Sequence, residues 1–206
     1  MSIVSFFAKG LLIGFSIAAP VGPIGILCIR QTLMFGVLAG LACGLGAAIA
    51  DLMYGIIGGF GLTCISSILL SQKTILSIAG GLFLGYLGIK TLLEKPADNH
   101  EKTSHKNLLT SFIATFLLTL TNPMTILSFT AILAGLGLGT AGTTYQTALV
   151  LVSGIFIGSL LWWFLLCGSV SIFRQKITSQ NLLWINRISG TIILCFAIII
   201  LLSICK

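Results

Sequence analysis

Six apolar stretches, each of about 20 residues or more, follow one another along this 206-residue chain. We place them near residues 4–28, 36–61, 74–93, 108–133, 146–170 and 182–204. An α-helix of about 20 apolar residues crosses the hydrocarbon core of a bilayer, and it satisfies its own backbone hydrogen bonds there. The sequence therefore predicts an all-α membrane protein with six transmembrane helices.

The composition excludes a soluble protein. Only 7% of the residues are charged and 57% are hydrophobic, with a mean hydropathy of +1.15, whereas soluble domains carry about 25% charged residues. The net charge of +7 does not indicate a nucleic-acid partner, because the basic residues occur singly at the ends of apolar runs, where they set membrane topology. The first 30 residues are not typical of a cleavable signal peptide, because their apolar run is too long.

One hydrophilic segment, at about 94–107, holds three of the four acidic residues and both histidines. Such mixed charge is typical of a solvated loop, and it favours a loop over a metal site built on His100 and His105. The loop divides a single membrane domain, residues 1–206, into halves at about 1–93 and 108–206. Each half contains three of the predicted helices.

The two halves share a pattern. Proline interrupts the first helix of each half, at Pro20 and Pro23 and then at Pro123. The second helix of each half carries Gly-x4-polar-x2-aromatic, as Gly46, Asp51 and Tyr54 and then as Gly154, Ser159 and Trp162. Repeats with an odd number of spans insert in opposite directions, as in many secondary transporters. We therefore expect two inverted three-helix repeats, with the first and fourth helices broken at proline.

The basic residues predict the orientation. Six spans place the loops after the first, third and fifth helices on one side of the membrane. That side collects Arg30, Lys90, Lys95, Lys102, Lys106, Arg174, Lys176 and Arg187, against Lys9, Lys73 and Lys206 on the other. Because basic loops stay in the cytoplasm, we expect a multi-pass membrane protein with a cytoplasmic central loop.

Asp51 is the only acidic residue outside the hydrophilic loop, and it lies midway along the second apolar run. A charged side chain at the bilayer centre costs at least about 2.5–3.5 kcal/mol, and such residues usually face an ion or substrate path. Asp51 would then bind a substrate ammonium group or carry a coupling proton; a hydrogen-bonded structural Asp is the alternative. Repeat symmetry adds Tyr54, Ser159 and Trp162 to the candidate site.

The two proline breaks complete the candidate site. Pro20, Gly22 and Pro23 should break the first helix, and a break in lipid is tolerated where it lines a cavity. Asn122 before Pro123 is a good start signal for a half-helix, and half-helix N-termini attract carboxylates. The alternatives are a packing kink at the first break and simple capping by Asn122.

Other patterns indicate structure rather than chemistry. Glycines recur every four residues at 36, 40 and 44, at 81 and 85, and at 154 and 158, a spacing that lets membrane helices approach closely. The six cysteines form no C-x-x-C and should behave as small hydrophobic residues. No catalytic motif and no phosphate-binding loop is present, so we expect neither an enzyme nor a cofactor.

Five segments in order resemble the LysE/RhtB family of amino-acid exporters. They are residues 19–30 (APVGPIGILCIR), 44–54 (GLGAAIADLMY), 80–90 (GGLFLGYLGIK), 120–123 (LTNP) and 187–190 (RISG). Family members often have Lys after Asn-Pro, where this chain has Met124. The resemblance implies export of amino acids or similar small solutes, linked to the proton motive force.

Our leading hypothesis is therefore an amino-acid exporter of the bacterial inner membrane that gives alternating access by rocking of its repeats. A divalent metal-cation exporter of a related family would need several hard ligands. A thiol–disulfide enzyme would need a redox cysteine pair. A non-transporting subunit would tolerate Asp51→Asn. The sequence is compatible with a monomer and with a homo-oligomer.

Overall fold

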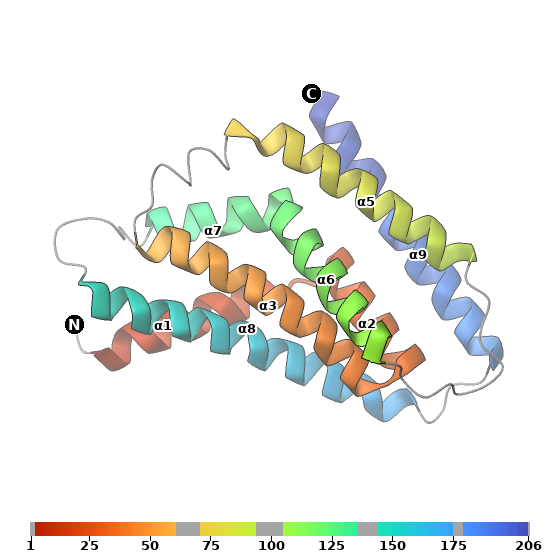
Figure 1. Ribbon diagram of the computed structural model, residues 1–206, viewed down its shortest axis with the longest axis horizontal. Helices are drawn as coiled ribbons and strands as arrows, with labels where there is room; N and C mark the ends of the chain where they lie inside the picture. The colour runs from red at the N-terminus through yellow and green to blue at the C-terminus, as the bar shows by residue number, and fades with distance from the viewer. Residues whose placement is uncertain (1–2, 61–70, 94–104, 136–143, 175–178, 206) are drawn as a thin grey trace.

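The computed structural model describes residues 3–60, 71–93, 105–135, 144–174 and 179–205 (Figure 1). Within these ranges the chain is helical and contains no strand. The α-helices are α1 (Ile3–Ala18), α2 (Pro23–Phe35), α3 (Val37–Gly59), α5 (Lys73–Leu93), α6 (His105–Thr121), α7 (Pro123–Gly135), α8 (Tyr145–Arg174) and α9 (Ser179–Leu202). A short 3-10 helix, Ser203–Cys205, follows α9.

Four of the described helices are long and apolar enough to cross a membrane by themselves, namely α3, α5, α8 and α9. Two further spans arise if each bent pair counts as one. The pair α1 and α2 bends by 80°, and the pair α6 and α7 bends by 59°. Both bends fall at the predicted proline breaks, so the all-α membrane fold with broken first and fourth helices is confirmed.

The central hydrophilic segment is only partly described. Residues 94–104 lie outside the described ranges, and His100 with them. The sequence assigned 105–107 to this loop, but α6 begins at His105. The helix therefore starts within the polar segment, because an α-helix can continue beyond the apolar core of the membrane.

The corner between α2 and α3 depends on Gly36. Its φ of 98° lies in the left-handed region that glycine alone adopts freely. The N–H of Gly36 donates to the carbonyl of Thr32 at 3.0 Å and closes α2. Gly36 is thus a corner residue, whereas its four-residue spacing had assigned it to packing. The next glycine of that series, Gly40, does pack, against the Thr32 side chain and Cys167.

Glycines bring α1 and α8 into backbone contact. Gly10 and Gly14 of α1 face carbonyl oxygens of α8, and Gly154 and Gly158 of α8 face carbonyl oxygens of α1. Van der Waals packing drives helix association in lipid, and small residues let it operate at short range. The packing role predicted for Gly154 and Gly158 is confirmed.

The helix pairs agree with a two-fold arrangement of the halves. The α6 helix packs along α3 as α1 packs along α8, and α3 also crosses α8 while α5 packs along α9. Gly46 of α3 faces the backbone of α6 at Phe112, and its counterpart Gly154 faces the backbone of α1 at Phe7. Equivalent helices of the two halves therefore make equivalent contacts.

Candidate functional site

A small cavity of about 60 Å³ lies where the two broken helices meet α3 and α8, and we call it the inner cavity. It receives residues from both sides of both breaks. The lining residues are Ile17, Ala18, Pro20, Gly22, Pro23, Ile24, Gly25, Ala47, Asp51, Thr119, Asn122, Thr125 and Trp163. The structure thus brings together five of the nine candidate site residues, which come from segments far apart in the sequence.

Asp51 is 3% exposed and lines this cavity from the middle of α3. The hydroxyl of Ser159, on α8, donates to Asp51 Oδ2 at 2.7 Å. Trp163 Nε1 donates to Ser159 Oγ at 3.2 Å, one helical turn further along α8. The hydroxyl proton of Ser159 is therefore directed at Asp51, and the carboxyl group faces a cavity beside both breaks instead of lipid.

The bond between Asp51 and Ser159 has a symmetry consequence. The two residues occupy equivalent positions in the shared motif, 108 residues apart. Equivalent residues of a two-fold arrangement can contact each other only close to the axis. The inner cavity therefore lies at the interface between the two halves.

The first break places the start of a helix beside the inner cavity. The α2 helix begins at Pro23, which has no N–H, and its N-cap residue Gly22 makes no side-chain capping bond. The next residues, Ile24 and Gly25, both line the cavity. Early N–H groups of a helix have no partner within the helix, and they carry the positive end of its dipole. This end of the cavity favours an anionic group.

The second break is capped by a side chain. The N–H of Met124 donates to Asn122 Oδ1 at 3.1 Å, so the predicted capping of α7 by Asn122 is confirmed. Asn122 also lines the inner cavity, whereas Pro123 is buried as the first residue of α7 and does not line it. Met124 is 66% exposed.

Tyr54 and Trp162 lie beside the breaks and not in the inner cavity. The hydroxyl of Tyr54 donates to the carbonyl of Leu120 at 2.6 Å, just before the second break, and its ring stacks on Phe129. The ring of Trp162 meets Phe15 edge-on, with centroids 5.4 Å apart, near the end of α1. Each aromatic side chain therefore supports one break.

The aromatic residue that lines the cavity is Trp163, which the sequence prediction left out of the candidate site in favour of Trp162. The repeat pattern selected Trp162 because of its spacing from Gly154. The spacing of four between Ser159 and Trp163 was the available signal, since such residues lie on one helix face. Thr119 and Thr125 were missed as well, because threonine is common in membrane helices.

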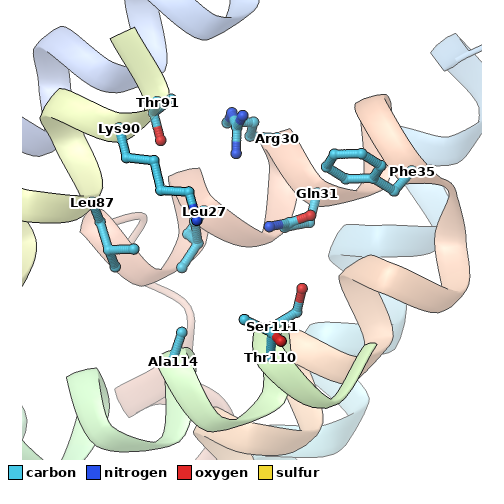
Figure 2. Close-up of a pocket in the computed structure, with 10 residues that line it drawn as sticks. All are labelled: Leu27, Arg30, Gln31, Phe35, Leu87, Lys90, Thr91, Thr110, Ser111 and Ala114. Carbon is cyan, nitrogen blue, oxygen red and sulfur yellow. The ribbon is translucent and has the colours of Figure 1, made fainter. Parts of the chain in front are cut away.

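A second, larger cavity of about 240 Å³ opens between α2, α5 and α6, and we call it the outer cavity (Figure 2). It is lined by Leu27, Arg30, Gln31, Phe35, Leu87, Lys90, Thr91, Thr110, Ser111 and Ala114. Sequence reasoning used Arg30 and Lys90 only as topology signals. Within the described part of the chain, no group of three or more His, Cys, Asp and Glu side chains is placed to hold a metal ion.

The fold and the inner cavity define a class, a multi-pass helical membrane protein with two broken helices around a buried carboxyl group. The sequence profile of the LysE type translocator family matches residues 15–203, and the chain belongs to that family. The matched range includes both breaks and every candidate site residue. The family resemblance of the five segments is confirmed.

One relative is a Bacillus subtilis (strain 168) protein named "Putative amino acid efflux protein YcgF". It is 32% identical over 197 residues, which cover 93% of each chain. No solved structure gives a significant match.

Proposed function

We propose that this chain is a secondary exporter of amino acids or related small solutes across a bacterial inner membrane, and not an enzyme. Membership of a translocator family and the name of the Bacillus relative support export. The observation that carries the proposal is the position of Asp51. It is buried in a cavity flanked by both broken helices, where Thr119, Asn122 and Thr125 add polar side chains to a mainly apolar lining.

The inner cavity offers a partner for each end of an amino acid. The Asp51 carboxylate would receive the ammonium group. The substrate carboxylate would lie at the start of α2, near the N–H groups of Ile24 and Gly25. Gly22 leaves room there, since a Cβ at this position would meet no atom within 4 Å.

The size of the inner cavity supports alternating access. Sites for small organic ligands usually measure about 300–1,000 Å³, and this cavity measures about 60 Å³. The conformation therefore corresponds to a closed site, and the halves must separate to admit a substrate. Rocking of one repeat against the other about a fixed site at their interface would open it.

Coupling to protons gives Asp51 a second possible role. In a protein that alternates between two conformations, a carboxyl group can take up a proton from one side of the membrane and release it to the other side. Transport driven by the proton motive force would use this step. Exchange of substrate for substrate across the membrane needs no net proton movement. A measurement of exchange can therefore separate binding of the substrate ammonium group by Asp51 from transfer of a proton by Asp51.

Growth assays identify the solute. Bacteria that overproduce the chain would be challenged with single amino acids supplied as dipeptides, and the amino acid released into the medium would be measured. We expect relief of growth inhibition and increased release for at least one amino acid, and loss of both in Asp51→Asn. If no amino acid is released above the level of the empty vector, although the protein is present in the membrane, the proposal is wrong.

A further inference from the structure

The outer cavity is rich in hydrogen-bond donors and positive charge. Figure 2 shows the amino group of Lys90, from α5, and the side-chain amide of Gln31, from α2, directed into it from opposite sides. Arg30 lines it from α2, and Thr91 and Ser111 contribute partly or wholly buried polar side chains. Two cations and several polar groups around a space of about 240 Å³ suit an anionic ligand.

Arg30 is held in one orientation. It is 3% exposed, and its Nε donates to Oδ1 of Asn186 at 2.8 Å. Asn186 lies on α9 and is itself 1% exposed, so the contact is well protected. A guanidinium group has five N–H donors in a rigid plane that matches a carboxylate. A buried arginine within membrane helices is costly, and such residues usually serve a substrate path.

The outer and inner cavities lie along the same two helices. On α2 the inner cavity includes Ile24, and the outer cavity includes Arg30 two turns later. On α6 the inner cavity includes Thr119 and the outer cavity includes Ala114. Both cavities are therefore lined by α2 and α6, and we treat them as two compartments along these helices.

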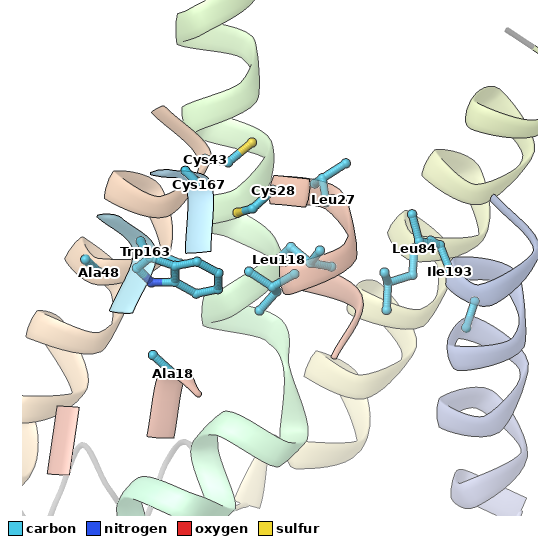
Figure 3. Close-up of a cluster of buried hydrophobic side chains, with 13 residues drawn as sticks. Ala18, Leu27, Cys28, Cys43, Ala48, Leu84, Leu118, Trp163, Cys167 and Ile193 are labelled. Carbon is cyan, nitrogen blue, oxygen red and sulfur yellow. The ribbon is translucent and has the colours of Figure 1, made fainter. Parts of the chain in front are cut away.

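An apolar layer separates these compartments. Leu27 of α2 and Leu118 of α6 belong to one cluster of buried apolar side chains, which Figure 3 shows together with Leu84 of α5. Leu27 is 4% exposed and Leu118 is 1% exposed, so both side chains are packed and almost inaccessible to water. A solute in the outer cavity must pass this layer to reach Asp51.

We propose that the outer cavity is a first binding site for the carboxylate of the substrate, formed by Arg30 and Lys90 and occupied from the cytoplasm before the substrate passes Leu27 and Leu118. This inference rests on the proposed function for the identity and direction of the solute. The recognition of a carboxylate rests on the cavity alone. Arg30 supplies a fixed planar donor, and Lys90 supplies a mobile second charge.

The test measures the charge preference of the cavity without relying on transport. Gln31→Cys places a thiol in the cavity, and the parent chain provides the background from the native cysteines. The reagents are the anionic 2-sulfonatoethyl and the cationic 2-trimethylammonioethyl methanethiosulfonates, applied to inside-out vesicles. Each rate is divided by the rate of the same reagent with free 2-mercaptoethanol.

We expect the anionic reagent to react about tenfold faster than the cationic one after this correction, because two positive charges lie nearby. Adding Lys90→Gln or Arg30→Gln should reduce that preference about threefold or more. The matched control is Arg187→Gln, which removes an exposed cation that stacks on Trp184 and should leave the preference unchanged.

A mixture of the nineteen protein amino acids other than cysteine, whose thiol would consume the reagent, serves as the protecting probe, and it should slow the anionic reagent in the Gln31→Cys chain but not after Lys90→Gln. A corrected rate ratio near one in the Gln31→Cys chain overturns the anion site, whatever the protein transports. A strong anionic preference without protection leaves an anion site but overturns the amino-acid substrate. Reaction only in right-side-out vesicles overturns the cytoplasmic location.

Discussion

The contact between α1 and α8 gives a prediction whose size follows from the structure. In Gly158→Ala the new methyl group would overlap the carbonyl oxygen of Leu11 and lie 2.9 Å from the backbone nitrogen of Phe15. Ordinary contacts of a Cβ atom begin at about 3.4 Å, so α1 must move away by at least about 0.5 Å. The overlapping atoms belong to the backbone and cannot rotate aside.

Overpacking of this kind costs about 1–3 kcal/mol. A chain of this size loses about 2–4 °C of melting temperature per kcal/mol, so Gly158→Ala should melt about 2–12 °C lower than the parent. The matched control is Gly168→Ala on the same helix, where a Cβ meets nothing within 4 Å. Alanine favours a helix over glycine by up to about 1 kcal/mol, so this control should melt no lower than the parent.

The assay is thermal unfolding of the purified protein in detergent, followed by the loss of the monodisperse peak in size-exclusion chromatography. Gly14→Ala also forces α1 away from α8, since its methyl group meets the carbonyl of Ile155. Once one substitution has displaced α1, the second should cost less, so the double variant should lose less than the sum of the two. Equal melting temperatures for Gly158→Ala and Gly168→Ala would refute the backbone contact.

Two further predictions concern the second break. Tyr54→Phe removes the donor to the carbonyl of Leu120 and should cost about 0.6–1.7 kcal/mol, the range for such bonds in membranes, whereas Tyr86→Phe alters an exposed side chain and should cost nothing measurable in the same assay. Asn122→Ala removes the cap of α7 and should cost about 1 kcal/mol, whereas Asn122→Ser keeps a capping oxygen and should recover most of this stability. Equal melting temperatures within either pair would contradict the corresponding contact.

Much of the candidate site could be predicted from local chemistry. Proline lacks an N–H, so breaks were predicted at Pro23 and Pro123, with a helix start at Pro123, and a helix begins at each of the two residues. A single carboxyl group in an apolar run has to find a polar partner, and the repeat pattern pointed to Ser159 as the equivalent residue. These inferences succeeded because each depends on a few neighbouring residues or on an equal spacing.

The rest depends on how the helices are rotated and packed. Trp162 and Trp163 are adjacent in sequence, and only the orientation of α8 decides which one faces the inner cavity. Arg30 and Lys90 lie far apart in sequence on different helices, so their shared cavity arises from tertiary packing. The start of α6 at His105 was missed because composition marks the apolar part of a helix and not its full length.

The most direct test of the account measures transport by purified protein in liposomes. The amino acid identified by the growth assay would be loaded with a radioactive label, and its efflux would be followed under an imposed proton gradient. Asp51→Asn should reduce efflux to the level of liposomes without protein. Ser159→Ala should slow efflux, while Ser153→Ala, which alters an exposed serine of the same helix, should not.

Exchange of labelled for unlabelled amino acid then separates the two roles of Asp51. If exchange persists in Asp51→Asn, Asp51 carries the proton, and if exchange is lost, Asp51 binds the substrate amine. Efflux from Asp51→Asn at the rate of the parent would contradict the central claim that this buried carboxyl group operates the transport site.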